Sequence, residues 1–378
     1  MKSEPELQSK TIDFLRFPLS IAVIFIHMAP TVKGSNINWS SLSGIDLYAI
    51  IAVLCSRILS ATVVPTFFLF SGFLFFLGLK TWSKDYYTGK IKKRIKTLLI
   101  PYILWNLIAF ISVLGKKIGL YVIKGDNTLF DYLRELWTDG SFIKLFWNSG
   151  IGGGELNWFG SRIPTYFPSD YPLWFLRDLI VVSLLTPLVY YLVKYMKQYG
   201  LILLGMFYVT GVWFPIAGFS INALFFFSIG AYFSINGKNL IDSLQKCKIP
   251  FYILALLFII PFIYFDGSKN AIYFKPFFII AGVISIMNLT ADILEKKNYS
   301  ISNTFVKSSF FVYALHGILV LGSCKIIYNK LFSPVLPLEM TIGYLLVPFI
   351  TAGVCLALFF LMKRFCPKTL GLLTGSRF

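Results

Sequence analysis

The sequence predicts an all-α integral membrane protein with about ten transmembrane helices and with both termini in the cytoplasm. Of its 378 residues, 57% are hydrophobic and only 14% are charged. A typical soluble domain is about 45–50% apolar and about 25% charged. A soluble core of this length could not bury so much apolar surface, so lipid must be part of the solvent. This composition excludes a soluble enzyme, a disordered tail and a secreted disulfide scaffold.

Apolar runs near the length that crosses a bilayer, about 20 residues, predict about ten spans along the chain. The stretch between Asp46 and Leu79 is too long for one span. Arg57 divides it, so its first part is expected to lie in the membrane interface or to re-enter the membrane. The predicted spans are 12–31, 59–79, 97–114, 172–193, 199–215, 221–236, 249–265, 271–291, 308–328 and 341–362.

The basic residues predict the orientation of these spans. Lys and Arg number 35 against 17 Asp and Glu, which gives a formal net charge of +18. In a soluble protein this imbalance would suggest a nucleic-acid partner. In a membrane protein, short cytoplasmic loops are enriched in Lys and Arg. Here the basic clusters follow every second predicted span, beginning with the loop at residues 80–96. The charge therefore indicates cytoplasmic loops and cytoplasmic termini, and no nucleic-acid partner is expected.

One membrane domain is expected to cover residues 1–378. The longest polar segment, residues 115–171, is rich in glycine and aromatic residues and is expected to form a structured extracytoplasmic loop. The first apolar run has no small-x-small cleavage site after it, so it is interpreted as a retained helix rather than a signal peptide. The five cysteines form no C-x-x-C pair, so neither a metal site nor a disulfide framework is expected.

The chain contains only two histidines, His27 and His316, and both lie in apolar runs. Ionisable groups at membrane depth cost a few kcal/mol, so each is a candidate for function. Arg16 precedes His27 by eleven residues, which is close to three helical turns and places the two on one face about 16 Å apart. The structural alternatives are a snorkelling anchor for Arg16 and a hydrogen-bonded packing role for either histidine.

Three more charged residues are expected toward the outer leaflet. Arg177 and Asp178 lie about two turns inside the fourth predicted span, and Arg57 precedes the second. A buried chamber lined by these residues and His27 is consistent with their depths, although an Arg–Asp pair can also serve helix packing. In the second span, Ser71 and the glycine after it permit a close approach of two helices.

This set of residue types suits acyl transfer from a thioester to a hydroxyl group. An imidazole is the natural general base near neutral pH, and arginines can bind an anionic donor or stabilise an oxyanion. A proton-coupled transporter would also use buried His, Arg and Asp. Such a carrier usually has a chain of acidic groups, and Asp178 is the clearest one inside the predicted spans, which mildly favours the enzyme.

Four segments resemble membrane acyltransferase family 3, whose bacterial members O-acetylate surface glycans. Arg16 and His27, with ten residues between them, are similar to the R-x10-H signature of that family. Residues 57–73 (RILSATVVPTFFLFSGF), 173–179 (LWFLRDL) and 309–316 (SFFVYALH) resemble its other motifs in the same order. Each match is weak alone, whereas four in order over nearly the whole chain are fairly specific. The chain resembles the short, stand-alone members of the family.

The resemblance implies roles for particular residues. His27 would be the catalytic base or a transient acyl carrier, and Arg16 would help to bind the acyl-CoA donor. The family also carries a basic R-x-x-R-type motif before the third span. Here Lys93, Arg94 and Lys96 offer a site for the CoA phosphates, and Thr97 stands where a second arginine is expected.

The resemblance also implies the reaction and its setting. Acetyl-CoA would donate an acetyl group to a hydroxyl of a cell-surface or lipid-linked glycan, in a multi-pass protein of the bacterial cytoplasmic membrane surrounded by lipid. The acceptor, the acyl chain, the oligomeric state and the choice between direct transfer and an acyl-histidine relay stay open. The alternatives are a transporter or flippase for a polysaccharide or its precursor and, less favoured, a membrane sensor.

Overall fold

A computed structural model describes residues 4–138, 141–297, 302–332 and 335–377. The protein is predominantly helical, as predicted, with one two-stranded sheet. Within the described ranges, six helices are long and apolar enough to cross a membrane, and a bent pair would make a seventh. The predicted count of about ten spans is therefore not confirmed. Two of the predicted spans fall on helices of only 13 and 15 residues.

The elements follow one another in a simple order. The strands are β1 (Gly150–Leu156) and β2 (Arg162–Phe167). The helices are α1 (Glu4–Ile26), α2 (Gly44–Val53), α3 (Val63–Phe76), α4 (Lys84–Arg94), α5 (Ile100–Lys124), α6 (Thr128–Thr138), α7 (Ser141–Trp147), α8 (Trp174–Leu184), α9 (Thr186–Tyr191), α10 (Gln198–Thr210), α11 (Ile221–Ile235), α12 (Leu240–Gln245), α13 (Lys248–Phe265), α14 (Ala271–Lys297), α15 (Asn303–Leu315), α16 (Leu321–Leu331), α17 (Pro337–Phe365) and α18 (Pro367–Thr374).

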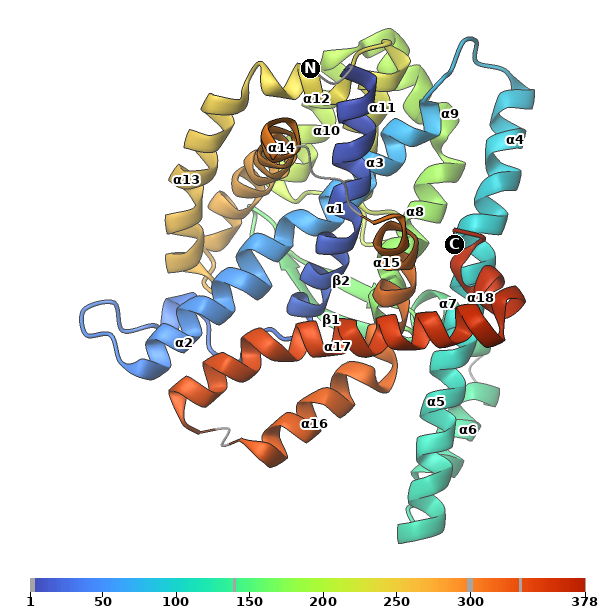
Figure 1. Cartoon of the computed structure of the whole chain (residues 1–378), viewed down its shortest axis with the longest axis vertical. Helices are drawn as coiled ribbons and strands as arrows, with labels where there is room; N and C mark the ends of the chain where they lie inside the picture. Colours follow the sequence, from blue (N-terminus) through green and yellow to red (C-terminus); the bar gives the residue numbers. More distant parts are fainter. Residues whose placement is uncertain (1–3, 139–140, 298–301, 333–334, 378) are drawn as a thin grey trace.

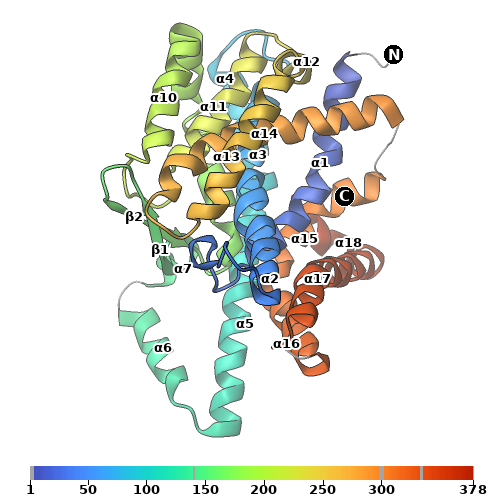
Figure 2. The ribbon, with the colours of Figure 1, turned by 90° about the vertical axis from the view of Figure 1, so that its left-hand side faces the viewer.

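Helix α1 runs through the body and packs against α14 and α15 (Figure 1). Helix α1 contains the charged residues Lys10, Asp13 and Arg16. These charges explain why it is not among the six helices that are long and apolar enough to cross a membrane. In both views the N-terminus, α12 and the connection from α3 to α4 lie toward one end of the body, and the β1–β2 hairpin lies nearer its middle (Figures 1 and 2). The orientation of the chain in the membrane stays a prediction.

Arg57 does not divide its apolar stretch, contrary to the sequence prediction. Helix α2 starts at a capping box between Ser43 and Asp46, and the chain then stays helical to Phe76 through a π-helical turn at Leu54–Ile58 and a 3-10 turn at Leu59–Thr62. The π-helical turn that contains Arg57 widens the helix without ending it, because its backbone groups remain hydrogen-bonded.

The close helix approach predicted at Ser71 and Gly72 is confirmed. A Cβ atom added at Gly72 would lie 2.0 Å from the carbonyl oxygen of Phe227 on α11. One at Gly230, also on α11, would lie 2.0 Å from the carbonyl oxygen of Leu69 on α3. Two glycines thus bring the backbones of α3 and α11 into contact, and phenylalanines from both helices fill the core around them.

Two predicted spans are broken in the structure. The fourth is split between α8 and α9, which are bent by 64°. The ninth is interrupted after α15 by a turn at His316–Val320 in which Leu319 has a φ of +66°. That left-handed conformation costs a non-glycine residue about 1–2 kcal/mol and marks a constrained position. His316 therefore lies at a kink rather than in the middle of a straight helix.

The polar segment at residues 115–171 is structured. Helix α5 continues to Lys124 and is followed by α6, α7 and an antiparallel hairpin in which Gly150 pairs with Phe167 and Leu156 with Arg162. Helices α5 and α6 extend beyond the rest of the molecule in both views (Figures 1 and 2). The hairpin leads directly into Tyr171 and α8, so this segment delivers side chains to the centre of the molecule.

Candidate active site

The two histidines, 289 positions apart in the numbering, meet in the structure. The ring of His27, one residue after α1, stacks on the ring of His316 with 5.1 Å between centroids and an interplanar angle of 24°. The Nδ1 atom of His27 lies 3.1 Å from the hydroxyl oxygen of Tyr171. These three side chains come from three separate segments, so the fold itself assembles the cluster.

Hydrogen bonds fix the orientation of His316. Its Nδ1 atom lies 2.6 Å from the carbonyl oxygen of Tyr313. A carbonyl oxygen only accepts, so Nδ1 carries the proton and Nε2 carries a lone pair. His316 is fully buried, and within the described part of the chain its Nε2 has no hydrogen-bond partner. The Tyr313 hydroxyl donates to the carbonyl of Pro172, which joins α15 to the segment that carries Tyr171.

Lys325 of α16 donates a hydrogen bond of 2.9 Å to the carbonyl oxygen of His27. It thereby ties the turn after α1 to the second half of the broken ninth span and brings a positive charge close to the histidine pair. Sequence analysis did not select this residue. The same rule that selected the histidines, an ionisable group inside an apolar run, would have found it.

A cavity of about 730 Å³ reaches Ile26, the residue before His27. Arg57, Arg177 and Asp178 line it, as expected for the predicted chamber. His27 is not part of the lining, although its neighbour Ile26 is. The cavity is walled by the hairpin, α8 and the segment between α10 and α11, and these supply many aromatic side chains. Those rings belong to Trp158, Tyr166, Trp174, Tyr208, Trp213, Phe214 and Phe219.

Arg57 binds the loop that follows His27. Its Nη1 atom donates to Asp266 at 2.7 Å, and its Nη2 atom donates to the carbonyl of Pro30 at 2.5 Å. The same Asp266 oxygen accepts the backbone N–H of Gly34 at 3.1 Å. A Cβ atom at Gly34 would lie 1.9 Å from the carbonyl oxygen of Ile263, so only glycine fits there. Arg57 is thus placed to position the end of α1.

Arg177 and Asp178 form the predicted ion pair. The guanidinium donates from Nε and Nη2 to one carboxylate oxygen of Asp178 at 3.0 and 2.8 Å. Its Nη1 atom donates to the carbonyls of Trp147 and Tyr166 at 2.6 and 3.1 Å. Both side chains of the pair are buried, at 4% and 3% exposure. The pair therefore fastens α8 to α7 and the hairpin, which supports the packing interpretation while leaving both groups in the cavity wall.

The predicted donor-binding residues differ in environment. Lys93 and Lys96 are exposed, whereas Arg94 is partly buried and donates from Nη2 to the carbonyl of Ser71 at 3.2 Å. The hydroxyl of Ser71 itself has no hydrogen-bond partner within the described chain. Arg16 forms an i,i+3 ion pair of 2.9 Å with Asp13 and is about one-third exposed. Of the basic residues before α5, Arg94 is the one directed into the protein.

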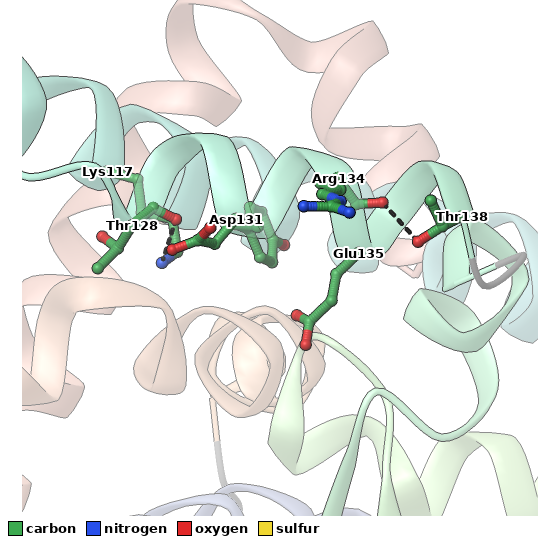
Figure 3. Close-up of a pocket in the computed structure, with 7 residues that line it drawn as sticks. Lys117, Thr128, Asp131, Arg134, Glu135 and Thr138 are labelled. Atoms are coloured by element: carbon green, nitrogen blue, oxygen red, sulfur yellow. Dashed lines mark hydrogen bonds between the residues drawn. The ribbon is translucent and has the colours of Figure 1, made fainter.

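A second, open cavity of about 390 Å³ lies between α5 and α6 (Figure 3). Its lining of Lys117, Asp131, Arg134 and Glu135 is formed by residues of these two helices that project from the body. None of the predicted site residues is in this lining. Across the described residues, no group of His, Cys, Asp and Glu side chains could hold a metal ion.

Comparison with known proteins decides the family. An acyltransferase domain family matches residues 9–362. The protein belongs to this acyltransferase family. It is also similar to the succinoglycan biosynthesis protein ExoH of Rhizobium meliloti (strain 1021), at 25% identity over 98% of this chain and 92% of that protein. No solved structure matches. The family and the apolar helices together indicate a multi-pass membrane acyltransferase.

In this acyltransferase, the motif segments found in the sequence converge. Residues 309–316 end at His316, which contacts His27, and residues 173–179 follow Tyr171 in the chain. Tyr171 was not predicted as a site residue, and neither was Asp170 before it. Asp170 is buried at 2% exposure, and one of its carboxylate oxygens has no partner among the described residues. Their position just before the LWFL motif was the available signal.

The buried ion pair of the acyltransferase supports a prediction about stability. Arg177→Leu leaves the buried carboxylate of Asp178 without its ion-pair partner and two backbone carbonyls without their donor, so we expect it to lower the free energy of unfolding by about 3–5 kcal/mol. Asp178→Asn keeps a polar partner and should cost less. Lys10→Gln, which breaks the exposed pair with Glu6, is the matched control and should cost about 0–1 kcal/mol. Thermal unfolding in detergent measures all three, and equal losses would contradict the proposed anchoring.

Proposed function

We propose that the protein transfers an acyl group, acetyl in the first instance, from cytoplasmic acyl-CoA to a hydroxyl group of a cell-surface or lipid-linked glycan. The observation that carries this proposal is the contact of His27 with His316 and Tyr171 at the end of α1, next to the large cavity. His27 is half-buried and is held by a tyrosine hydroxyl close to a substrate-sized cavity, an arrangement that suits general-base catalysis.

Helix α1 provides the proposed path for the acyl donor. Arg16 and His27 are joined by continuous helix up to Ile26, which places them about 16 Å apart along the axis. Burial, and then the charges of both Arg94 and Arg16, lower the pKa of Arg377, which supports a common location for Arg94 and Arg16. A donor whose phosphates bind these arginines could extend its thioester along α1 toward His27.

The acceptor side rests on the cavity. Its wall combines aromatic rings with charged and polar groups, which is typical of sites that bind small polar ligands. Aromatic faces pack against the apolar face of a sugar ring, and groups such as Arg57 and Asp178 can hydrogen-bond its hydroxyls. The similarity to a succinoglycan biosynthesis protein supports a glycan as the acceptor.

The reaction balances with the residues present. The acceptor oxygen attacks the thioester carbonyl, and His27 accepts the hydroxyl proton as the new C–O bond forms. The C–S bond then breaks, and the leaving thiolate takes the proton to give free CoA. Tyr171 and His316 hold the His27 ring in position, and Lys325 adds positive charge near the developing oxyanion.

The proposal is tested by mass spectrometry of surface glycans in cells with and without the gene for this protein, followed by transfer from labelled acetyl-CoA with the purified protein. We expect acyl esters on the glycan to disappear with the gene and label to enter the glycan in vitro. Movement of glycan across reconstituted vesicles without consumption of acetyl-CoA would instead establish the transporter alternative and overturn the proposal.

A further inference from the structure

Helix α18 is held against the start of α5. Leu370, Leu373 and Thr374 of α18 are buried, and the indole N–H of Trp105 donates to the carbonyl of Leu373 at 2.9 Å. Gly375 follows in the left-handed region with a φ of +62°. A Cβ atom there would lie 2.6 Å from the Cα atom of Thr97. Glycine is therefore required, and its turn directs the next residues back into the protein.

This turn places Arg377 on the π-helical turn between α4 and α5. Its Nη2 atom donates to the carbonyl oxygen of Thr97 at 2.7 Å. Its guanidinium carbon lies 4.3 Å from the centroid of the Phe310 ring on α15. Among the described residues, the guanidinium of Arg377 is hydrogen-bonded on one edge and covered by a ring on one face, which leaves N–H groups that can bind another ligand.

Two further arginines lie close to Arg377. Burial, and then the charges of Arg94 and Arg16, lower the pKa of Arg377 to about 9. Arg94 precedes Thr97 by three residues, one helical turn, and its guanidinium is fixed by the carbonyl of Ser71 and lies 5.6 Å from the centroid of the Phe75 ring. The three arginines come from α1, from α4 and from the C-terminal segment.

Their charges are poorly balanced by the protein. Among the described residues, the ion pairs of these arginines include one carboxylate, that of Asp13 on Arg16. Arg94 and Arg377 are bound to neutral carbonyls instead. Like charges that are partly removed from water repel one another, so such a cluster is stable chiefly when an anion joins it. Three guanidinium groups together are well suited to bind a phosphate, because a phosphate accepts several charge-assisted hydrogen bonds at once.

We propose that Arg377 completes a phosphate-binding site with Arg16 and Arg94, and that the C-terminal segment exists to supply this third guanidinium. Arg377 binds at Thr97, the position where the sequence lacks the second arginine of a basic motif. The assignment of the phosphate to the CoA part of the donor rests on the proposed function. An anionic lipid headgroup offers the same chemistry, so the experiment distinguishes the two sources.

The test measures binding of CoA, which carries no acyl group and needs no turnover, to the full-length protein in nanodiscs of zwitterionic lipid. We expect Arg377→Gln to weaken CoA binding about tenfold or more, because it removes charge-assisted hydrogen bonds. Pantetheine, which has no phosphate, should bind wild type and variant equally. Arg364→Gln is the matched control, because this exposed arginine near the end of α17 lies outside the site, and it should bind CoA like the wild type.

Arg377→Lys guards against a folding defect. It keeps the charge but loses the planar fork, so we expect intermediate CoA affinity with unchanged thermal unfolding. Wild-type affinity for CoA in both Arg377 variants would overturn the inference and leave the proposed function intact. Unchanged CoA binding with a loss of co-purifying phosphatidylglycerol would assign the phosphate to lipid and overturn the donor assignment. A wild-type protein that neither binds CoA nor acylates glycan would overturn the proposed function itself.

Discussion

Replacing His27 with alanine is expected to lower the rate of acyl transfer by about 10²–10⁴-fold, the usual contribution of a general base. The side chain is in contact with Tyr171 and His316, the preceding residue Ile26 lines the cavity, and the backbone carbonyl of His27 is held by Lys325. The variant removes the proton acceptor without removing these backbone contacts. We therefore expect kcat to fall while the KM for acetyl-CoA changes little. Transfer of labelled acetyl groups by the purified protein measures both.

Variants of Tyr171 and His316 show whether a loss of rate belongs to His27 itself. Tyr171→Phe removes only the hydroxyl that contacts Nδ1 of His27, so we expect a smaller loss of rate, and Tyr195→Phe, at an exposed tyrosine, controls for loss of a hydroxyl. His316→Gln tests the other imidazole, whose Nε2 lacks a partner among the described atoms. Full transfer by a folded His27→Ala protein would remove His27 from the mechanism, and a loss confined to the His316 variant would move the base to that residue.

Much of the candidate site could be predicted from sequence because its residues are chemically unusual where they stand. A histidine or an arginine inside an apolar run is costly, so His27, His316, Arg57 and Arg177 were conspicuous without any knowledge of contacts. Their grouping was less accessible. The contact between the two histidines depends on the kink after α15, and the left-handed φ of Leu319 at that kink has no signature in a leucine residue.

The predicted number of spans, about ten, is not confirmed by the six or seven candidate spans of the described residues, and the difference has a physical reason. Hydropathy measures how apolar a run is, whereas a span also needs an unbroken helix of sufficient length. Arg57 was expected to end a helix because it is charged, but Asp266 and the carbonyl of Pro30 satisfy its guanidinium, and the helix continues. Conversely, the apolar run at 172–193 contains a bend of 64° at the start of α9, where Pro187 is a signal that hydropathy alone does not use.

Residues missed by sequence analysis share a property. Tyr171 and Arg377 are ordinary in composition and location, one in a loop and one near the end of the chain. They matter because the fold returns them to α1 and to Thr97, respectively. Such long-range contacts cannot be derived from periodicity in one sequence, since periodicity describes which face of an element is apolar and not which elements meet.

A large structural effect is also expected at Gly72. Gly72→Ala puts a Cβ atom 2.0 Å from the carbonyl oxygen of Phe227, a distance that no rotamer change can relieve because both atoms belong to backbone-fixed positions. Helices α3 and α11 would have to separate and lose the packing of their buried phenylalanines. We expect the free energy of unfolding to fall by about 3 kcal/mol or more. Unfolding of the purified protein by heat and by SDS measures the loss.

Gly115 on α5 provides the matched control, because a Cβ atom there meets nothing within 4 Å. Gly115→Ala should leave stability unchanged or raise it by up to about 1 kcal/mol, the difference in helix propensity between the two residues. The same chemical change would thus have opposite signs at the two sites. The effect at Gly72 should also reach function, since Ser71 holds the guanidinium of Arg94 through its carbonyl and α3 continues the helix that carries Arg57. Equal stabilities of the two alanine variants would show that α3 and α11 are not held at the distance that the structure gives them.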